Sequence, residues 1–314
     1  MTITHILIRL LVLAVIFVNG WTDAPNAIAT AVGSGAMTFR KAVTLAAACN
    51  FAGTAVSCLL FPTVAATMED LIHFSHQQSA LTALCAAMLS IVVWSVAAWR
   101  FGLPTSESHA LLAGLSGCAL ALGSDSASLN GGAWLKVIGG MILSLAAGFM
   151  AARLVRIPLS THRCNAVVWQ RIAAGSMAAL HGAQDGQKFM ALLLMSDTLD
   201  QTKETHPVIL LLLVAGVMAL GTALGGKPIV EKVGKELSGL SPTEGLAADL
   251  GGGAVLLVCS LLGLPVSTTH AKVSAICGAG RHPDHKIIGQ LAGVWVLTFP
   301  CCALLSFLLT KLML

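Results

Sequence analysis

The chain has 314 residues, of which 56% are hydrophobic and 10% are charged, whereas a soluble domain has about 25% charged residues. This composition excludes an ordinary soluble domain and indicates a protein that crosses a membrane several times. The net charge of +4 is small and the basic residues are dispersed, so nucleic-acid binding is not expected. Nine scattered cysteines form no CxxC pair. They are expected to be buried thiols, and the chain is expected to need no cofactor.

Ten apolar segments follow one another along the chain, and about 20 residues suffice for one crossing. All are expected to be helical, because the lipid interior offers no partner to open backbone. The sequence therefore predicts an all-α polytopic membrane protein with about ten membrane segments. They are 3–38, broken near Asp23 and Pro25, then 41–61, 79–99, 102–122, 132–152, 171–195, broken near Gly182 to Gly186, then 207–225, 249–263, 264–280 and 286–312.

The basic residues of the connections fall on one side of the membrane if these segments alternate in direction. They are Arg40, Lys41, Arg100, Arg153, Arg156, Arg163, Arg171, Lys227, Lys232, Lys235, Arg281 and Lys286. The opposite connections, 62–78, 123–131 and 196–206, are acidic or neutral, with Glu69, Asp70, Asp125, Asp197, Asp200, Lys203 and Glu204. By the positive-inside rule the basic side is cytoplasmic, and both termini lie outside.

Two motifs occur twice in the same order. Gly102-Leu-Pro-Thr-Ser-Glu-Ser-His-Ala110 returns as Gly263-Leu-Pro-Val-Ser-Thr-Thr-His-Ala271, 161 residues later. Upstream, Asn19-Gly-Trp-Thr-Asp-Ala-Pro-Asn26 corresponds to His181-Gly-Ala-Gln-Asp-Gly-Gln-Lys188 at an offset of 162. The chain is therefore read as two homologous halves.

Five crossings in each half is an odd number, so the second half is expected to be inverted relative to the first. We predict a first repeat at 1–152, a short basic cytoplasmic linker at 153–170 and a second, inverted repeat at 171–314. Inverted repeats with discontinuous helices and Pro-led hairpin segments are the architecture of secondary transporters. The repeated motifs are expected to meet near the middle of the bilayer.

Carboxylates inside a membrane helix need polar partners, because each costs about 2.5–3.5 kcal/mol to insert. Asp23 and Asn26 share a helix face, as do Asp185 and Lys188. Asp23, Asn26 and Asp185 are candidate ligands for a coupling cation, and Glu107, His109 and His270 are candidates for proton transfer. Two simpler readings stay open: Asp185 and Lys188 form a structural ion pair, and the histidines are interior side chains with satisfied hydrogen bonds.

Hydroxyl groups follow each proline of the second motif. Pro104 and Pro265 favour the first turn of a helix, and a buried helix N-terminus offers free N–H groups and a positive dipole to an anion. Two such termini facing each other would hold a tetrahedral oxyanion. The alternative is that these hydroxyls bond to backbone carbonyls within the bundle. The candidate anion ligands are Thr105, Ser106, Ser108, Ser267, Thr268, Thr269, Gln184 and Lys188.

At these four motifs the sequence resembles the inorganic phosphate transporter (PiT) family, whose repeats each contain a GANDxANA-like motif and a P-[TS]-S-x-[ST]-H-like motif. The likeness spans essentially the whole chain. It implies a cation-coupled symporter for inorganic phosphate, driven by sodium or protons through alternating access. Without a large central hydrophilic loop, the chain looks like a bacterial member in the inner membrane.

The sequence departs from the family pattern at several positions. Thr22 and Gln184 replace the usual asparagines, and Pro25 stands where alanine is common. Lys188 aligns with Asn26, and we hypothesise that its ammonium group takes the place of a cation, neutralises Asp185, and favours proton coupling or fewer sodium ions. Lys272 is a second candidate counter-charge, or reaches towards the cytoplasmic face.

Several alternatives follow from the same residues. A hydroxyl cradle suits sulfate as well as phosphate, and sulfate permeases are thought to occur in this family. Buried carboxylates favour phosphate, because only hydrogen phosphate can donate a proton to them. An anion channel is the rival from another class; an enzyme is not expected, because no HExxH occurs and the Ser and His positions are duplicated. Lipids are the expected surroundings, and a homodimer or a regulatory protein docked on the basic segment 153–171 is left open.

Overall fold

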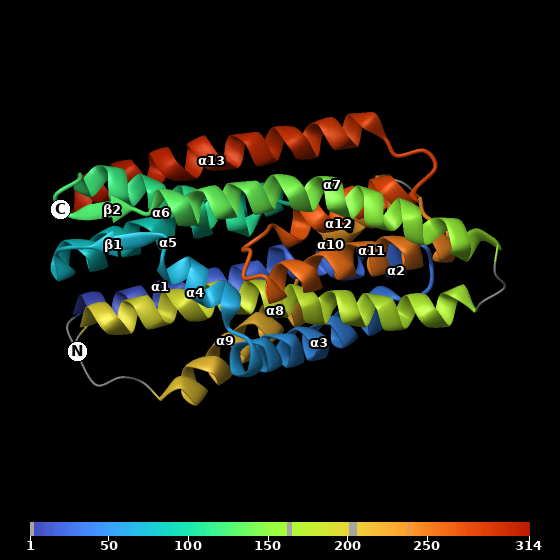
Figure 1. Cartoon of the computed structure of the whole chain (residues 1–314), viewed down its shortest axis with the longest axis horizontal. Helices are drawn as coiled ribbons and strands as arrows, with labels where there is room; N and C mark the ends of the chain where they lie inside the picture. Colours follow the sequence, from blue (N-terminus) through green and yellow to red (C-terminus); the bar gives the residue numbers. More distant parts are fainter. Residues whose placement is uncertain (1–2, 162–164, 201–205, 238) are drawn as a thin grey trace.

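The computed structural model describes residues 3–161, 165–200, 206–237 and 239–314. It is an elongated bundle in which most helices run along one axis (Figure 1). The helices of the first part are α1 (Ile3–Thr22), a 3-10 turn at Ala24–Ile28, α2 (Ala29–Gly33), α3 (Phe39–Leu60), α4 (Thr63–Glu69), α5 (Gln77–Arg100), α6 (Glu107–Leu122) and α7 (Gly131–Thr161). Those of the second part are α8 (Ala166–Asp200), α9 (Pro207–Leu224), α10 (Lys227–Glu231), a π-helical turn at Lys232–Glu236, α11 (Pro242–Leu261), α12 (Thr268–Ala279) and α13 (His285–Met313).

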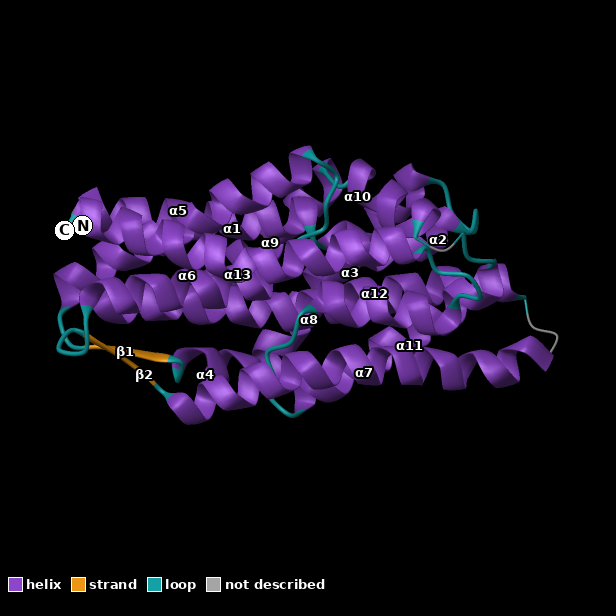
Figure 2. Cartoon of the chain, turned by 90° about the horizontal axis from the view of Figure 1, so that it is seen from above, coloured by secondary structure: helices purple, strands orange, loops and turns teal. Residues whose placement is uncertain are grey.

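Seven stretches of the described chain are long and apolar enough to cross a membrane. This confirms an almost entirely helical, multi-pass membrane protein. Two of the predicted segments are shorter than a crossing: α6 has 16 residues and α12 has 12, which at 1.5 Å per residue span about 24 and 18 Å. Figure 2 shows α6 and α12 in opposite halves of the bundle. Both are therefore half-length helices that begin inside the bundle.

The predicted break in the first segment is confirmed. α1 ends at Thr22, and a 3-10 turn from Ala24 separates it from α2. Pro25 explains the break, because proline has no N–H for the helix ladder.

The predicted break near Gly182 to Gly186 is wrong, because α8 is continuous from Ala166 to Asp200. The second motif has Gln187 where the first has Pro25 at the offset of 162, so the backbone keeps its hydrogen bonds. The two glycines serve helix packing instead. A Cβ atom on Gly182 would lie 2.3 Å from the Asn50 carbonyl oxygen of α3, and one on Gly186 would lie 2.5 Å from Thr54.

The predicted linker at 153–170 is mostly helical. α7 continues to Thr161 and α8 starts at Ala166, because arginines are good helix formers beyond the membrane. Arg163 and Cys164 of that segment, and Lys203 and Glu204 of the predicted loop 196–206, lie outside the described residues.

A two-stranded ribbon was not predicted. β1 (Ile72–Phe74) pairs antiparallel with β2 (Ala127–Leu129), with Ile72 opposite Leu129. The ribbon lies at the end of the bundle where both chain termini lie (Figures 1 and 2). Each strand has only three residues, which is too short for a recognisable period-two pattern.

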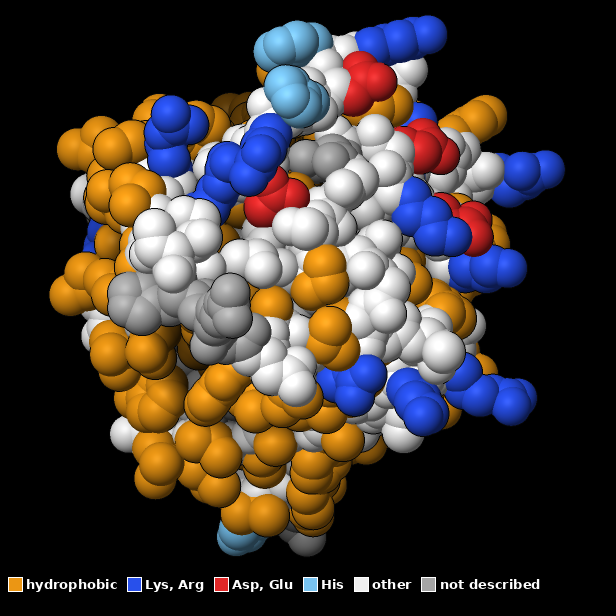
Figure 3. All heavy atoms as spheres, turned by 90° about the vertical axis from the view of Figure 1, so that its right-hand side faces the viewer, with side chains coloured by type: hydrophobic (Ala, Val, Ile, Leu, Met, Phe, Trp, Pro, Cys, Tyr) orange, Lys and Arg blue, Asp and Glu red, His pale blue; other side chains and the backbone are white. Residues whose placement is uncertain are grey.

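The opposite end of the bundle carries many Lys and Arg side chains, whereas apolar side chains cover much of the adjoining flank (Figure 3). Apolar side chains of α7, such as Leu135, Leu154 and Ile157, are more than half exposed. Such a belt suits contact with lipid tails. The interior holds an apolar cluster that includes Val12, Ile16, Leu84, Met88 and Leu111.

Candidate functional site

The two Pro-led segments meet in the interior of the bundle. Ser106 and Ser267 are the N-caps of α6 and α12, and each hydroxyl accepts a hydrogen bond from the backbone N–H three residues on, at 3.2 Å. The Ser106 hydroxyl also donates to the Ser267 hydroxyl at 2.8 Å. Two buried helix N-termini, 161 residues apart in the chain, are thus joined directly. Their positive dipole ends point at the same place.

The backbone before each N-cap turns sharply at a glycine. Gly102 and Gly263 have φ of 64° and 62°, a region that other residues rarely adopt. These turns let the chain enter the bundle, pass a proline and start a helix in the middle. The repeated glycine of the motif is therefore explained by local geometry.

Asp23 lies at the break that follows α1 and receives three hydrogen bonds. Asn26 Nδ2 donates at 3.0 Å and Thr268 Oγ1 at 3.3 Å, while the Thr269 hydroxyl makes a short contact with Oδ1. Asn26 Nδ2 is also 3.3 Å from the Thr269 hydroxyl. The start of α12 is therefore bound to the first carboxylate motif, from the opposite half of the chain.

Asp185 projects from the middle of α8 towards the same cluster. Its oxygens accept from Lys188 Nζ at 2.6 Å and from Asn19 Nδ2 at 2.9 Å, and the Thr268 hydroxyl lies 3.5 Å away. His181 Nε2 is 3.4 Å from Asp185 Oδ2. Thr268 therefore lies between the two carboxylates, and Asp23 and Asp185 belong to one cluster.

The ammonium group of Lys188 lies in a shell of three oxygens. Asp185 Oδ1, the Ser108 hydroxyl and the Val266 carbonyl are each 2.6 Å from Nζ. The side chain is 2% exposed, so its charge is compensated by protein groups. Removing one partner of such a pair costs about 3–5 kcal/mol.

Other predicted site residues lie at the edge of this cluster. Glu107 Oε1 accepts from the Thr22 hydroxyl at 3.3 Å. Gln184 Nε2 donates to the Leu264 carbonyl at 3.1 Å. Thr105 contributes its carbonyl oxygen, which accepts from the Thr269 hydroxyl at 3.1 Å.

His109 and His270 pack on each other. Their rings are 4.5 Å apart and nearly perpendicular, and His270 also lies 4.0 Å from the ring of Trp295. Both ring nitrogens of His270, and Nδ1 of His109, lack a hydrogen-bond partner among the described residues. The reading that both histidines have satisfied hydrogen bonds is therefore wrong, fully for His270 and at Nδ1 for His109.

The sequence did not single out Asn19 as a ligand, although it is the first residue of the repeated motif. Its amide holds Asp185, and its Oδ1 atom is buried without a partner in the part of the chain that the structure describes. Asn26 Oδ1 is in the same situation. One ligand atom each from Asp23, His181 and Asp185 lie within 4.8 Å of one another. Free amide oxygens beside two carboxylates are the ligands that a hard cation prefers.

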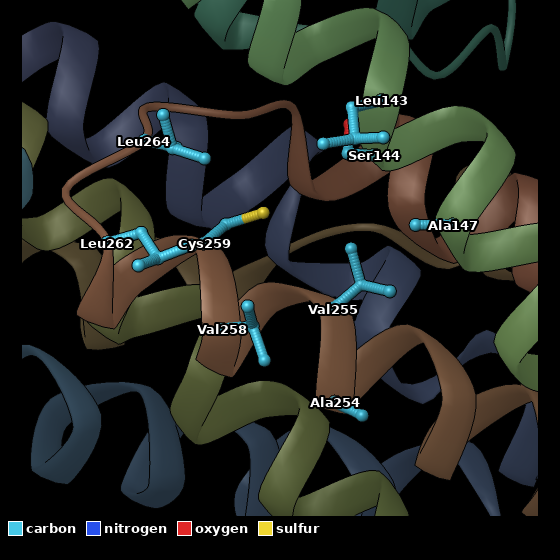
Figure 4. Close-up of a pocket in the computed structure, with 9 residues that line it drawn as sticks. All are labelled: Leu143, Ser144, Ala147, Ala254, Val255, Val258, Cys259, Leu262 and Leu264. Atoms are coloured by element: carbon cyan, nitrogen blue, oxygen red, sulfur yellow. The ribbon is translucent and has the colours of Figure 1, made fainter.

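The apolar pocket in Figure 4 is a different place. It has a volume of about 290 Å³ and lies between α7, α11 and the segment before Pro265. Among the described residues that line it, Ser144 is the one with a hydroxyl and none is charged. It therefore does not suit an oxyanion, and the buried polar cluster is the candidate site.

The cluster consists of residues from both repeated motifs, and the comparisons with known proteins extend over the whole chain. The model of the phosphate transporter family matches twice, at residues 19–169 and 160–306. A probable low-affinity inorganic phosphate transporter of Bacillus subtilis is 32% identical, with 97% of this chain and 95% of that protein covered. A protein of the same description from Rhizobium meliloti is also 32% identical, over 93% and 91%.

A solved structure described as the sodium-dependent phosphate transporter has the same fold. It covers 99% of both chains with a TM-score of 0.87 at 19% sequence identity. The resemblance noted in the four motifs is thereby confirmed, and the chain belongs to the phosphate transporter family.

Proposed function

We propose that this chain is a secondary active transporter that carries inorganic phosphate across the membrane in symport with a cation, by alternating access. Family membership and the descriptions of its relatives support phosphate as the substrate. The observation that carries the proposal is the hydrogen-bonded cluster in which Ser106 meets Ser267 and Asp23 shares Thr268 with Asp185. Clusters of this kind at discontinuous helices are the substrate sites of secondary transporters.

The anion would bind at the two joined helix N-termini. Hydroxyls that now donate to one another or to carboxylates would donate to phosphate oxygens, and Lys188 would supply a positive charge. Hydrogen phosphate can in turn donate a proton to a carboxylate, which sulfate cannot do. The proposed anion ligands are Thr105, Ser106, Ser108, Ser267, Thr268, Thr269, Gln184 and Lys188.

The driving cation would bind beside the anion. Asp23, Asn26 and Asp185 are the proposed ligands, and the free oxygen of Asn19 joins them. For protons, Glu107, His109 and His270 are the proposed carriers. The ion pair between Lys188 and Asp185 supports proton coupling or fewer sodium ions, because the ammonium already compensates one carboxylate.

Alternating access would use two inverted repeats, 1–152 and 171–314, joined by the basic segment 153–170. The two successive matches of the family model support a repeat. Both termini lie at one end of the bundle and the opposite end is basic. This arrangement supports termini outside the cytoplasm and a location in the plasma membrane, such as a bacterial inner membrane.

Uptake of radiolabelled phosphate into proteoliposomes tests this function, with sodium and proton gradients imposed separately and excess sulfate as competitor. We expect accumulation above equilibrium that needs one gradient and resists sulfate. If the protein took up sulfate but not phosphate, sulfate would be the substrate. Movement that only equilibrates phosphate would indicate a channel and contradict the proposal.

A further inference from the structure

A second buried cluster lies about one helical turn further along α12 than Thr268 and Thr269 of the proposed phosphate site. Lys272 of α12 makes an ion pair with Asp249 of α11, donates to the Thr30 hydroxyl of α2 at 3.0 Å and donates to the Ala27 carbonyl at 3.1 Å. The Thr30 hydroxyl donates to Asp249 at 2.7 Å. The Lys272 and Asp249 side chains are 0% exposed. The reading that Lys272 reaches towards the cytoplasmic surface is therefore wrong.

The surroundings of Lys272 match those of Lys188 in kind. Each ammonium group has one carboxylate oxygen, one side-chain hydroxyl and one backbone carbonyl as partners. The carbonyl at the second cluster belongs to Ala27, in the 3-10 turn where the first helix is broken. Unwound carbonyls of broken helices are the groups that coordinate sodium in transporters.

One more oxygen of this cluster is available. Asp249 Oδ2 is buried and has no hydrogen-bond partner among the described residues. Three oxygens, Asp249 Oδ1, the Thr30 hydroxyl and the Ala27 carbonyl, contact the ammonium group, and the free Oδ2 belongs to the same carboxylate. Such a set suits a hard cation.

Packing does not require this charge pair. At the offsets of 161 and 162 that relate the repeated motifs, the counterparts of Lys272, Asp249 and Thr30 are Leu111, Met88 and Leu192. These three are buried in one apolar cluster. The other half of the chain thus has apolar residues at the corresponding positions, and a buried ion pair adds little stability over an apolar replacement.

We propose that this cluster is a cation site that the chain fills with its own ammonium group, so that Lys272 stands permanently where a sodium ion would bind. The consequence for coupling rests on the proposed function. A tethered cation cannot be released, so this site adds no sodium ion to the transport cycle. The site itself is a property of the folded chain and is testable without transport.

The test compares Lys272→Ala with Lys272→Met in the purified protein. The alanine variant leaves a space beside the oxygens that the ammonium group contacts, whereas the methionine variant fills the same space with an apolar chain. Thermal unfolding is measured without phosphate, in sodium chloride and in choline chloride at equal ionic strength. We expect sodium to raise the unfolding midpoint of Lys272→Ala by about 2 °C or more beyond its effect on the wild-type protein, and expect no such gain for Lys272→Met.

Equal sodium effects in the wild-type protein and Lys272→Ala, or in the alanine and methionine variants, would overturn the proposal. Lys272→Ser, which adds a further oxygen, is the second small variant. If neither Lys272→Ala nor Lys272→Ser can be purified in sodium while Lys272→Met can, the space does not accept an ion and the proposal is also overturned. If the protein took up no phosphate in proteoliposomes, the proposed function would be overturned. The effect of sodium on the unfolding midpoint of the Lys272 variants would be unaffected.

Discussion

Ser106 and Ser267 each have two tasks at the centre of the cluster. Each caps a half-length helix, and the two hydroxyls form one hydrogen bond. Loss of an N-cap costs about 1 kcal/mol, and a hydrogen bond to a charged group is worth about 1.5–3 kcal/mol. Loss of such a hydrogen bond to bound phosphate corresponds to an affinity for phosphate that is about ten- to hundredfold weaker.

We therefore predict that Ser106→Ala and Ser267→Ala each raise the KM for phosphate about tenfold or more in proteoliposome uptake. Ser116→Ala is the matched control, because the Ser116 hydroxyl in α6 donates to the Leu112 carbonyl one turn back. Its KM should stay within about twofold of the wild-type value. Equal effects of the three substitutions would show that the hydroxyl pair has no special role.

Lys188 is the residue whose substitution should change the coupling ion. Lys188→Asn restores the residue type of its counterpart Asn26 and leaves Asp185 without a counter-charge, so a sodium ion becomes the natural partner. We predict that uptake by this variant depends more steeply on external sodium and less on pH. The measurement is uptake rate against sodium concentration at two pH values; unchanged dependence on both would refute this role.

The sequence did not reveal contacts that depend on how two helices pack against each other. The motif revealed Asp23 and Asp185 because inserting a carboxylate into a membrane helix is costly. The same cost applies to Asp249, but its partner Lys272 lies on another helix, and their contact depends on how α11 packs against α12. The sequence also did not show that Thr105 contacts Thr269 through its backbone carbonyl oxygen.

At the scale of the helix, α8 shows how one residue decides between a break and a continuous helix. Proline at position 25 correctly predicted the break after α1, whereas Gln187 at the matching place keeps α8 intact. The Gln187 side chain accepts from the Val64 amide of α4 at 2.9 Å. Repeat symmetry therefore predicted which motifs meet in the bundle, but predicted the helix break correctly only in the first half.

The glycines of α8 are predicted to be essential for its contact with α3. Gly182→Leu would place side-chain atoms on the Asn50 carbonyl, where a Cβ already comes within 2.3 Å. Overpacking of this kind costs about 1–3 kcal/mol or more. We expect a clearly lower unfolding midpoint and little transport. Gly139→Leu in α7 is the control, because a Cβ atom there would have no described atom within 4 Å; equal loss in both variants would contradict this packing role.

At the scale of the whole molecule, the two ends of the bundle differ in charge and hold different parts of the chain. The termini lie at the end with the β1–β2 ribbon, and the opposite end is rich in Lys and Arg (Figures 1 and 3). Composition alone predicted a multi-pass helical protein. The β1–β2 ribbon and the extension of α7 beyond the membrane could not be predicted from the sequence, because neither has a strong sequence pattern.

The proposed orientation predicts the behaviour of fusion proteins. Alkaline phosphatase fused after Leu314 should be active, and green fluorescent protein fused there should be dark. Fusions after Arg281, in the exposed basic connection before α13, should behave in the opposite way. The reverse pattern at both sites would place the termini in the cytoplasm.

In the proposed mechanism, one buried cluster couples the movement of phosphate to that of a cation. The most direct measurement is phosphate accumulation in proteoliposomes by the wild-type protein and Asp23→Asn, under a sodium gradient, a proton gradient or neither. We predict that the wild-type protein concentrates phosphate under one gradient only, and that Asp23→Asn, which keeps the shape but loses the charge, no longer responds to that gradient. Gradient-driven accumulation that is unchanged in Asp23→Asn would contradict the account.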